Sequence, residues 1–259
     1  MKARTRAEPT AQAYGELRHA FEVFNERLFD GQLPSPLITL QREPRTCGYF
    51  AGKRFVGQDG VTSDELALNP EYFACMSLCE VLQTLAHEMT HVWQAHFGRP
   101  GRGRYHNAEF ARKMIDIGLM PSTTGQPGGQ QTGDRMSDYP IVGGKFLQVV
   151  DHLVRDLNFS ITWYDRTVPT AAEISPTVQL EGLPPAALLV PANHGLKVIR
   201  RPTGGSSMGG ASTPAKTGRH KYQCPKCQAN AWARPKLNIA CVDCGEDFVD
   251  LEAPADAVA

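Results

Sequence analysis

Two histidines and a glutamate within five consecutive positions have the types and spacing of a metal-dependent hydrolytic site. His87, Glu88 and His91 occupy the fixed positions of an H-E-x-x-H pattern, here HEMTH. Residues four apart lie above one another on a helix, so His87 and His91 can both direct imidazoles at one zinc ion. Glu88 projects about a quarter turn away, where it reaches a water on the ion and can act as general base. The pattern therefore predicts a zinc site with Glu88 as its catalytic carboxylate.

A catalytic zinc takes three protein ligands and keeps its fourth position for water, so one more ligand must come from elsewhere in the chain. A histidine six residues after His91 would follow one known spacing, but Phe97 stands there and His96 is one place early. Glu109 fits the alternative in which a glutamate on a later helix is the third ligand. His106, fifteen residues after His91, is the other candidate. The residue pattern alone leaves Glu109 and His106 open.

Four of the seven cysteines predict a second, structural metal site near the end of the sequence. Cys224 and Cys227 form one C-x-x-C pair, Cys241 and Cys244 form another, and thirteen residues separate the pairs. This spacing is typical of a zinc ribbon, whose two knuckles hold one zinc and whose intervening residues form a β-hairpin. Four thiolates leave no open position, so this zinc is expected to hold together a module too small to fold alone. A redox role is less favoured, and His220, just outside the pairs, is not expected to be a ligand.

The first site needs elements that position it, and the apolar pattern predicts them. Residues 78–97 repeat apolar side chains at helical spacing, which places the H-E-x-x-H pattern on a mostly buried helix. A helix over 11–29 capped by Thr10, three short strands, and a helix from Asn107 to near Gly118 complete an α+β unit. The apolar stripe comprises Leu78, Leu82, Leu85, Met89, Val92 and Phe97. The expected strands are 37–41, 49–56 and 64–68.

Changes in composition divide the sequence into four expected segments. Residues 10–120 carry the patterned helices and strands, and residues 219–250 carry the cysteine pairs. Residues 201–218 are rich in Gly, Ser and Pro and are expected to be a linker. Residues 121–200 are expected to form either an extension of the first domain or a small separate one. The parts expected there are a long loop over 121–144, a short helix or strand pair over 146–157, and a strand over 159–164.

Length and composition favour a cytoplasmic globular protein. The chain has 259 residues, 41% of them hydrophobic, which is enough for a real core, and its formal net charge of zero by itself indicates no partner. No stretch approaches the roughly twenty apolar residues of a transmembrane helix, so no membrane partner is expected. The first residues lack the apolar region of a secretory signal. An odd cysteine count with metal-type spacing favours a reducing compartment over a disulfide framework.

Several stretches resemble the SprT/Spartan family of zinc metalloproteases. HEMTHVWQ, followed after a spacer by HNAEFARKM, is similar to that family's H-E-x-x-H and its later histidine in an H-G/N-x-E/D-aromatic setting. FNERLF before Leu33-Pro34, together with CGYF from Cys47, is similar to the start of that domain. The resemblance covers roughly residues 11–119. Asn107 departs from the glycine that is more frequent in the family, which barely affects ligation.

The resemblance implies a small zincin-type metalloprotease domain with a short β-sheet and packed helices. It implies His87, His91 and His106 as the ligands of a catalytic zinc and Glu88 as the catalytic residue. It also implies a substrate class, namely proteins bound or crosslinked to DNA, and thus a hydrolase of DNA–protein crosslink repair. The expected cofactors are two zinc ions, one catalytic and one structural in the ribbon.

The distribution of charge suggests a nucleic-acid partner for the ribbon. Nine Lys or Arg and no acids lie between Leu196 and Ala240, with Tyr222 and Trp232 among them. Basic groups follow a phosphate backbone and aromatic faces stack on unpaired bases, a combination that suits single-stranded DNA or RNA. Against this interpretation, a four-thiolate zinc carries about two negative charges, and six acids follow Val242. The basic residues are Lys197, Arg200, Arg201, Lys216, Arg219, Lys221, Lys226, Arg234 and Lys236.

The expected function is a zinc-dependent endopeptidase that acts on DNA-bound or DNA-crosslinked proteins, with the ribbon helping to engage nucleic acid. One alternative is a non-catalytic nucleic-acid-binding or transcription-associated zinc protein, in which the ribbon is the working part. A further alternative keeps the peptidase but gives it a free regulatory protein as substrate. The carboxylate of Glu88 separates the first two, because a purely structural zinc site does not need it.

Overall fold

The computed structural model describes residues 8–169, 182–191, 195, 197–200, 220–235 and 237–251. The chain divides into two compact units, one within residues 1–204 and the other within residues 205–259. The linker expected over 201–218 lies outside the described residues. No helix in the described ranges has the length and apolar character needed to cross a bilayer.

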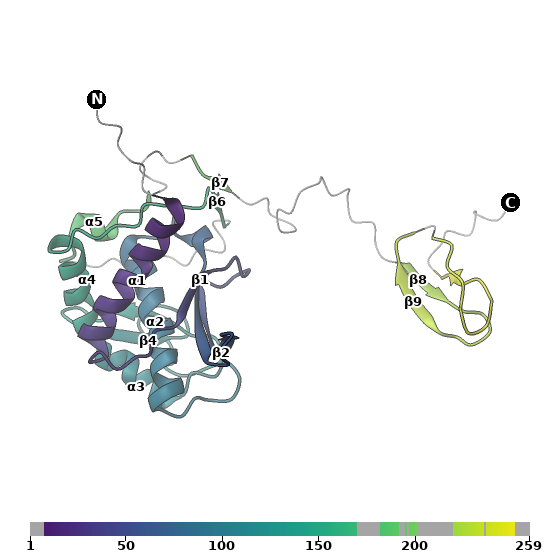
Figure 1. The fold of residues 1–259 in the computed structure, drawn as a ribbon, viewed down its shortest axis with the longest axis horizontal. Coiled ribbons are helices and arrows are strands. Elements are labelled where there is room, and N and C mark those ends of the chain that lie inside the picture. Colours follow the sequence, from purple (N-terminus) through teal and green to yellow (C-terminus); the bar gives the residue numbers. More distant parts are fainter. Residues whose placement is uncertain are drawn as a thin grey trace. The chain divides into compact units, whose positions relative to one another are not determined.

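The first unit has mixed α+β architecture, as the sequence predicts (Figure 1). Its larger helices are α1 (Pro9–Leu28), α2 (Leu78–Phe97), α3 (Ala108–Ile117) and α4 (Lys145–Arg155), with a short α5 (Pro185–Leu188) and a 3-10 turn η1 (Pro70–Tyr72). Its strands are β1 (Leu37–Leu40), β2 (Gly48–Val56), β3 (Thr62–Leu68), β4 (Leu119–Ser122), β5 (Ser137–Pro140), β6 (Thr167–Val168) and β7 (Ile199–Arg200). The helix over 78–97 and the three strands within 37–68 agree with the sequence pattern to within about two residues.

The main sheet has three strands in the order β1-β3-β2. β1 runs parallel to β3 with Leu40 opposite Leu68, and β2 runs antiparallel to β3 with Gly48 opposite the same Leu68. α2 packs against β2 and β3 and also contacts α1 and α3. The sheet and the helices share one hydrophobic core. Four residues of the apolar stripe are almost fully buried in it, namely Leu82, Leu85, Met89 and Val92, and Leu78 is partly buried.

The helix α2 begins with a capping box. The Ser77 hydroxyl accepts from the Glu80 N–H, and the Glu80 carboxylate accepts in return from the Ser77 N–H at 2.7 Å. The apolar stripe is buried along most of the helix, but Phe97 is 51% exposed, so its inclusion in the stripe was wrong. The reason is local, because residues 95–97 form a last turn whose side chains are all exposed.

Residues 121–164 differ most from the sequence prediction. The expected loop over 121–144 contains β5, which pairs antiparallel with β4 so that Pro121 lies opposite Asp138. The expected strand over 159–164 is not a strand. Instead Thr162 donates to the Glu16 carboxylate and Trp163 donates to Gln12, so this segment is bound by side chains of α1.

Helix α4 extends the core of the first unit. Its apolar face packs on α1, where the Phe146 and Phe24 rings meet edge to face at 5.8 Å between centroids. At the N-terminus of α1, Glu8 rather than the expected Thr10 is the N-cap, and Pro9 occupies the first turn. Proline is well suited to that position because its missing N–H has no partner inside a helix anyway.

The second unit is a small antiparallel sheet of β8 (His220–Gln223), β9 (Asn230–Ala233) and β10 (Val249–Asp250), in the order β10-β8-β9. The hairpin β8–β9 encloses the first cysteine pair, whereas the sequence placed the hairpin between the two pairs. Among the described residues of this unit Tyr222 is the largest buried side chain. Its hydroxyl donates to the Arg234 carbonyl and accepts from the Leu237 N–H, both at 3.0 Å.

Candidate metal centres

Two clusters of ligand-type side chains occur among the described residues, and they are the two groups that the sequence singles out. The first consists of His87, His91 and His106, and the second of the four cysteines. In each cluster the ligand atoms lie within 4.8 Å of one another. Of the two candidates for the third ligand, the structure brings His106 to the other histidines.

Two helices place the three histidines. His87 and His91 lie one turn apart on α2, and His106 lies two residues before α3. The Asn107 side chain caps α3 by accepting from the Phe110 N–H at 3.0 Å, as the sequence predicts, and it also accepts from Gln94 on α2 at 2.8 Å. This shared amide therefore joins the start of α3 to the helix that carries the other two histidines.

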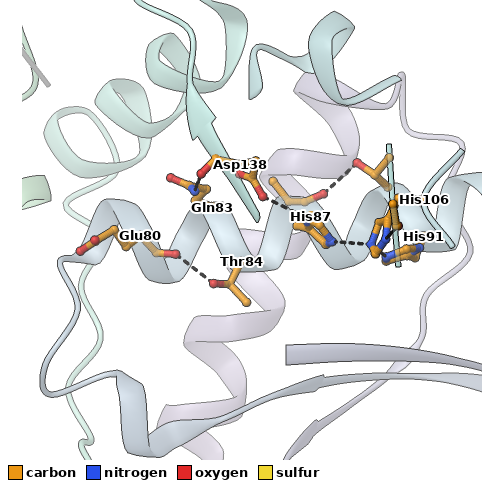
Figure 2. A network of polar contacts seen from close by, with 10 residues as sticks. Glu80, Gln83, Thr84, His87, His91, His106 and Asp138 are labelled. Atoms are coloured by element: carbon orange, nitrogen blue, oxygen red, sulfur yellow. Dashed lines mark hydrogen bonds and ion pairs between the residues drawn. The ribbon is translucent and has the colours of Figure 1, made fainter. Parts of the chain in front are cut away.

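The three imidazoles direct their Nε2 atoms at one point (Figure 2). The Nε2 of His106 is 3.3 Å from that of His87 and 3.1 Å from that of His91. A tetrahedral zinc with bonds of about 2.0–2.1 Å has ligand–ligand edges of about 3.3–3.4 Å. The spacing of the nitrogen atoms therefore fits three corners of such a site.

The second ring nitrogens show which atoms are free to bind a metal. The His87 Nδ1–H donates to the Asp138 carboxylate at 2.9 Å, and the His106 Nδ1–H donates to the Gly133 carbonyl at 3.1 Å. With Nδ1 as donor, each neutral ring presents a lone pair at Nε2. One proton can bridge only two of the three converging lone pairs, whereas a metal ion serves all three. The donor set thus fits a metal ion.

His91 is oriented by packing. Its ring lies over the Phe110 ring with centroids 4.4 Å apart and an interplanar angle of 33°. Phe110 is fully buried on α3, so the aromatic surface that supports His91 belongs to the same helix that follows His106. The same Phe110 ring also contacts the rings of His87 and His106, with centroids 5.2 and 4.7 Å away, so all three imidazoles pack on one aromatic side chain.

Burial and mutual repulsion keep two of the three imidazoles neutral. Burial, with help from His87 and His106, lowers the pKa of His91 well below its usual value. Burial is also the largest cause that lowers the pKa of His106 to about 4, with the charge of His87 adding to it. For His87, burial lowers the pKa, but the hydrogen bond to Asp138 and the charges of Glu88 and Asp138 outweigh it, so the net pKa is raised. A raised pKa means that His87 holds a second ring proton more tightly, and a divalent ion at the Nε2 atoms competes directly with that proton.

Glu88 lies next to His87 on α2 and is 6% exposed. Burial is the main cause that raises its pKa to about 7; the charge of Asp138 acts in the same direction and that of His87 opposes it. A bound cation would lower this pKa again, because an opposite charge favours the ionised carboxylate. Gly48 at the start of β2 packs over this side chain, since a Cβ there would lie 3.2 Å from Glu88 Cγ and 2.8 Å from the Ala67 carbonyl oxygen.

The other ligand candidates lie outside the histidine cluster. His96 pairs with the buried Asp64 at 2.6 Å, and Asp64 also accepts from the Lys53 N–H, so His96 connects the end of α2 to the sheet. Glu109 accepts from the Arg99 N–H at 2.6 Å and from Gln94 at 2.9 Å. The loop that leads into α3 thus uses Glu109 to fix its backbone.

Two contacts of the site were missed by sequence reasoning, namely Asp138 and the Gly133 carbonyl. Both lie in the segment that was expected to be a loop. Asp138 has no fixed spacing from the H-E-x-x-H pattern, so no short sequence pattern identifies it. A backbone carbonyl such as that of Gly133 is present in every residue and cannot be identified from residue type. Only the pairing of β4 with β5 brings them to the histidines.

The cysteine cluster is built from two tight turns. The Gln228 N–H donates to the Cys224 carbonyl and the Gly245 N–H to the Cys241 carbonyl. The Sγ atoms of Cys227 and Cys241, from different pairs, are 3.7 Å apart. Backbone N–H groups, first that of Cys227, lower the pKa of Cys224 to about 7. His220 lies outside the cluster, and its Nδ1 is 2.8 Å from the Asp250 carboxylate.

Comparison with known proteins agrees with the first cluster. A family model described as the SprT-like family matches residues 17–127, which include all three histidines. An uncharacterised protein in the mucB 3' region of Salmonella typhimurium is 56% identical over 59 residues, which make up 22% of this chain and 80% of that protein. No solved structure matches the chain significantly. Through the segment that carries the histidine cluster, the chain belongs to the SprT-like family.

Proposed function

We propose that the protein is a zinc-dependent endopeptidase that acts on proteins bound or crosslinked to DNA. The observation that carries the proposal is the convergence of three Nε2 atoms, two of them from the helix that also carries the buried Glu88. Two histidines and Glu88 come from one helix, so their mutual geometry is fixed by α2, and His106 completes the set from the start of α3. Membership of the SprT-like family, a metalloprotease-type family, supports the same interpretation.

Each residue then has a defined task. His87, His91 and His106 hold the zinc, which when bound supplies Lewis acidity toward a peptide carbonyl and an attacking water. Glu88 takes a proton from the water and returns it to the departing amine. Burial raises the pKa of Glu88 and a bound cation would lower it again, so the ionised form that accepts a proton is favoured once the metal is in place. The buried surroundings of Glu88 also limit competition from bulk water.

The second unit supports the DNA part of the proposal. Lys221 on β8 lies directly opposite Trp232 on β9, so a basic and an aromatic side chain share one face of the small sheet. Trp232 is 61% exposed. Such exposure is unusual for a tryptophan, and it leaves the indole face open to stacking by a nucleic-acid base. If this face binds DNA, protease and substrate are held on one strand. Such tethering raises their effective concentration without a tight peptide pocket.

The test compares the wild type with Glu88→Gln on a DNA-binding protein substrate, with zinc present and single-stranded DNA added or omitted. Substrate fragments and self-cleavage are followed on gels. We expect Glu88→Gln to reduce cleavage by about 10²–10⁴-fold, the usual contribution of a general base. Glu22→Gln, a carboxamide substitution at an exposed position of α1, is the matched control and should cleave like the wild type.

The two conditions separate the alternatives. Cleavage that needs both Glu88 and DNA supports the full proposal. Cleavage that needs Glu88 but is indifferent to DNA keeps the peptidase and removes the DNA-bound substrate class. No cleavage in any condition, with zinc still bound at both sites, would instead favour a non-catalytic nucleic-acid-binding protein.

A further inference from the structure

We infer that Asp138 is a positioning residue that holds His87 in its metal-binding orientation, and that the β4–β5 hairpin is required for a tight metal site. The inference rests on the proposed zinc site and goes beyond it, because it assigns a role to a segment that extends past the family match at residue 127. The hairpin, residues 119–140, comprises β4, β5 and the residues between them.

The backbone of Asp138 is anchored independently of its side chain. On one side Asp138 pairs with Pro121 in the β4–β5 ladder. On the other side its carbonyl accepts from the Gln83 side chain of α2 at 2.8 Å (Figure 2). Two elements therefore already fix the position of β5 over α2. The carboxylate is not needed to attach the hairpin, so its role must be sought in what it touches.

The carboxylate touches His87. Oδ2 accepts from His87 Nδ1 at 2.9 Å, while Oδ1 is buried and has no hydrogen-bond partner within the described part of the chain. The residue as a whole is 7% exposed. A buried carboxylate with one unpaired oxygen is costly unless its charge is used. Its position, one hydrogen bond behind a ligand ring, is where a negative charge strengthens a metal site.

The physical effect is on the orientation and tautomer of the ring. An acceptor at Nδ1 keeps the proton there and leaves Nε2 as the ligand atom. Without that acceptor the His87 ring can rotate about its χ2 axis or carry its proton on Nε2, and either change removes the lone pair from the metal position. A neutral acceptor of the same shape keeps the orientation but loses the charge.

The same hairpin also supports His106. Gly133 forms an isolated antiparallel bridge with His106, in which each backbone N–H donates to the other carbonyl, at 2.8 Å and 3.1 Å. The Gly133 carbonyl accepts in addition from the His106 ring at 3.1 Å. Two of the three ligands therefore depend on contacts from one hairpin, and those contacts lie beyond residue 127.

The experiment measures zinc affinity of the full-length chain by competition with a chelating dye. Asp138→Asn keeps the shape and a neutral acceptor, and Asp138→Ala removes the acceptor. Asp134→Asn is the matched control, because it makes the same charge change at an exposed position of the same hairpin. His91→Ala, which keeps all four cysteines, defines the zinc bound by the ribbon alone. We expect affinity at the histidine site to fall by about 10-fold for Asp138→Asn and by up to about 100-fold for Asp138→Ala.

A spectroscopic readout separates positioning from simple stability. With cobalt(II) at saturation, the visible absorption of the histidine site should change in both Asp138 variants and match the wild type in Asp134→Asn. Unchanged zinc affinity and an unchanged cobalt spectrum in Asp138→Asn and Asp138→Ala would overturn the inference. If Asp138→Ala fails to fold, Asp138→Asn decides alone. If the wild type binds no more zinc than His91→Ala, the histidine site binds no zinc and the proposed function itself is contradicted. That result differs from unchanged affinity in the Asp138 variants, which contradicts only the role of Asp138.

Discussion

The two candidate metal centres of this protein differ in how much of the surrounding fold is formed without the metal. The histidine cluster lies on a helix whose inner face is already buried, with Leu85, Met89 and Val92 at 0–1% exposure. In the described part of the ribbon the buried apolar side chains are Tyr222, Cys224 and Cys241, and two of these three belong to the candidate metal-binding cluster. In the first unit the fold therefore positions the ligands. In the second the ligands supply most of what holds the fold together.

The contacts that hold the ligand side chains in place also differ between the two clusters. The histidines are held by side chains and backbone from α3 and the β4–β5 hairpin, segments that are distant in sequence from α2. The cysteines are held by turns within their own pairs. A site with distant supports can be preorganised before the metal arrives. A site with only local supports is expected to fold with its metal.

The largest expected effect comes from removing metal from the ribbon. Cys241→Ser should abolish the ordered β8–β9–β10 sheet, because a structural zinc contributes about 10–16 kcal/mol of apparent binding free energy and the module has little other core. The helix α2 should keep its protection. Hydrogen exchange followed by mass spectrometry compares the peptide around Tyr222 with the peptide around Met89. Loss of protection at Met89 as well would contradict the separation of the two units' stabilities.

The reverse experiment destabilises the first unit and leaves the ribbon intact. Phe146 is fully buried and packs on Phe24, so Phe146→Ala should lower the free energy of unfolding of the first unit by about 3–5 kcal/mol. Urea unfolding is followed by tryptophan fluorescence in a Trp232→Phe background, so that Trp93 and Trp163 report on the first unit alone. Val142→Ala, at a position 77% exposed, is the control and should change little. Hydrogen exchange at the peptide around Tyr222 should be unchanged in Phe146→Ala, and an equal loss of protection there would show that the units unfold together.

Much of this arrangement could be predicted from local sequence patterns. The 3.6-residue apolar repeat defined α2, alternation and turn residues defined β1 to β3, and the spacing of the C-x-x-C pairs defined the ribbon ligands. Each of these signals is contained in a short window. The third histidine was different, because spacing alone left Glu109 and His106 open, and the family resemblance favoured His106.

The parts that could not be predicted depend on distant partners. β4 and β5 are four residues each, contain Pro121 and Pro140, and enclose a Gly-rich stretch, so their sequence is typical of a loop. Their pairing follows from α3, whose left-handed Gly118 cap leads directly into β4. The alternation over 159–164 predicted a strand, but the Thr162 N–H donates to the Glu16 carboxylate and the Trp163 indole N–H donates to the Gln12 side chain, both on α1. Asp138 was missed for the same reason, since only the hairpin brings it to His87.

A smaller effect is expected at the start of the helix that carries the site. Ser77→Ala removes one half of the capping box of α2 and should lower the free energy of unfolding of the first unit by about 0.5–2 kcal/mol. Zinc affinity at the histidine site should stay within about twofold, because His87 lies nearly three turns from the cap. Chemical denaturation and dye competition on the same variant measure both quantities. A large loss of zinc affinity would mean that the site is less preorganised than its burial indicates.

The smallest effect is a dependence on pH at the surface of the first unit. Asp116 lies 3.1 Å from the Lys145 ammonium and 3.4 Å from that of Lys113. Burial alone raises the pKa of Asp116, but hydrogen bonds and charges from Lys145 and Lys113 outweigh it, so the net pKa is lowered from 3.8. A lowered carboxylate pKa stabilises the folded state above the unfolded-state value of about 3.9, and this stability is lost as pH falls through the lower folded-state pKa.

Because the Asp116 side chain is 55% exposed, solvent screening limits its contribution to about 0.2–1 kcal/mol. Asp116→Asn should therefore be slightly less stable than the wild type at pH 6. The difference should shrink as pH falls through the lowered folded-state pKa of Asp116 and vanish once the wild-type carboxyl is also neutral. The Trp232→Phe background again confines the signal to the first unit, since acid also protonates the ribbon thiolates and releases their zinc. A difference that persists at low pH would mean that the substitution disturbs packing instead of charge. If the first unit instead unfolded at the pH at which the ribbon releases its zinc, the stability of the first unit would depend on the metal centre of the second.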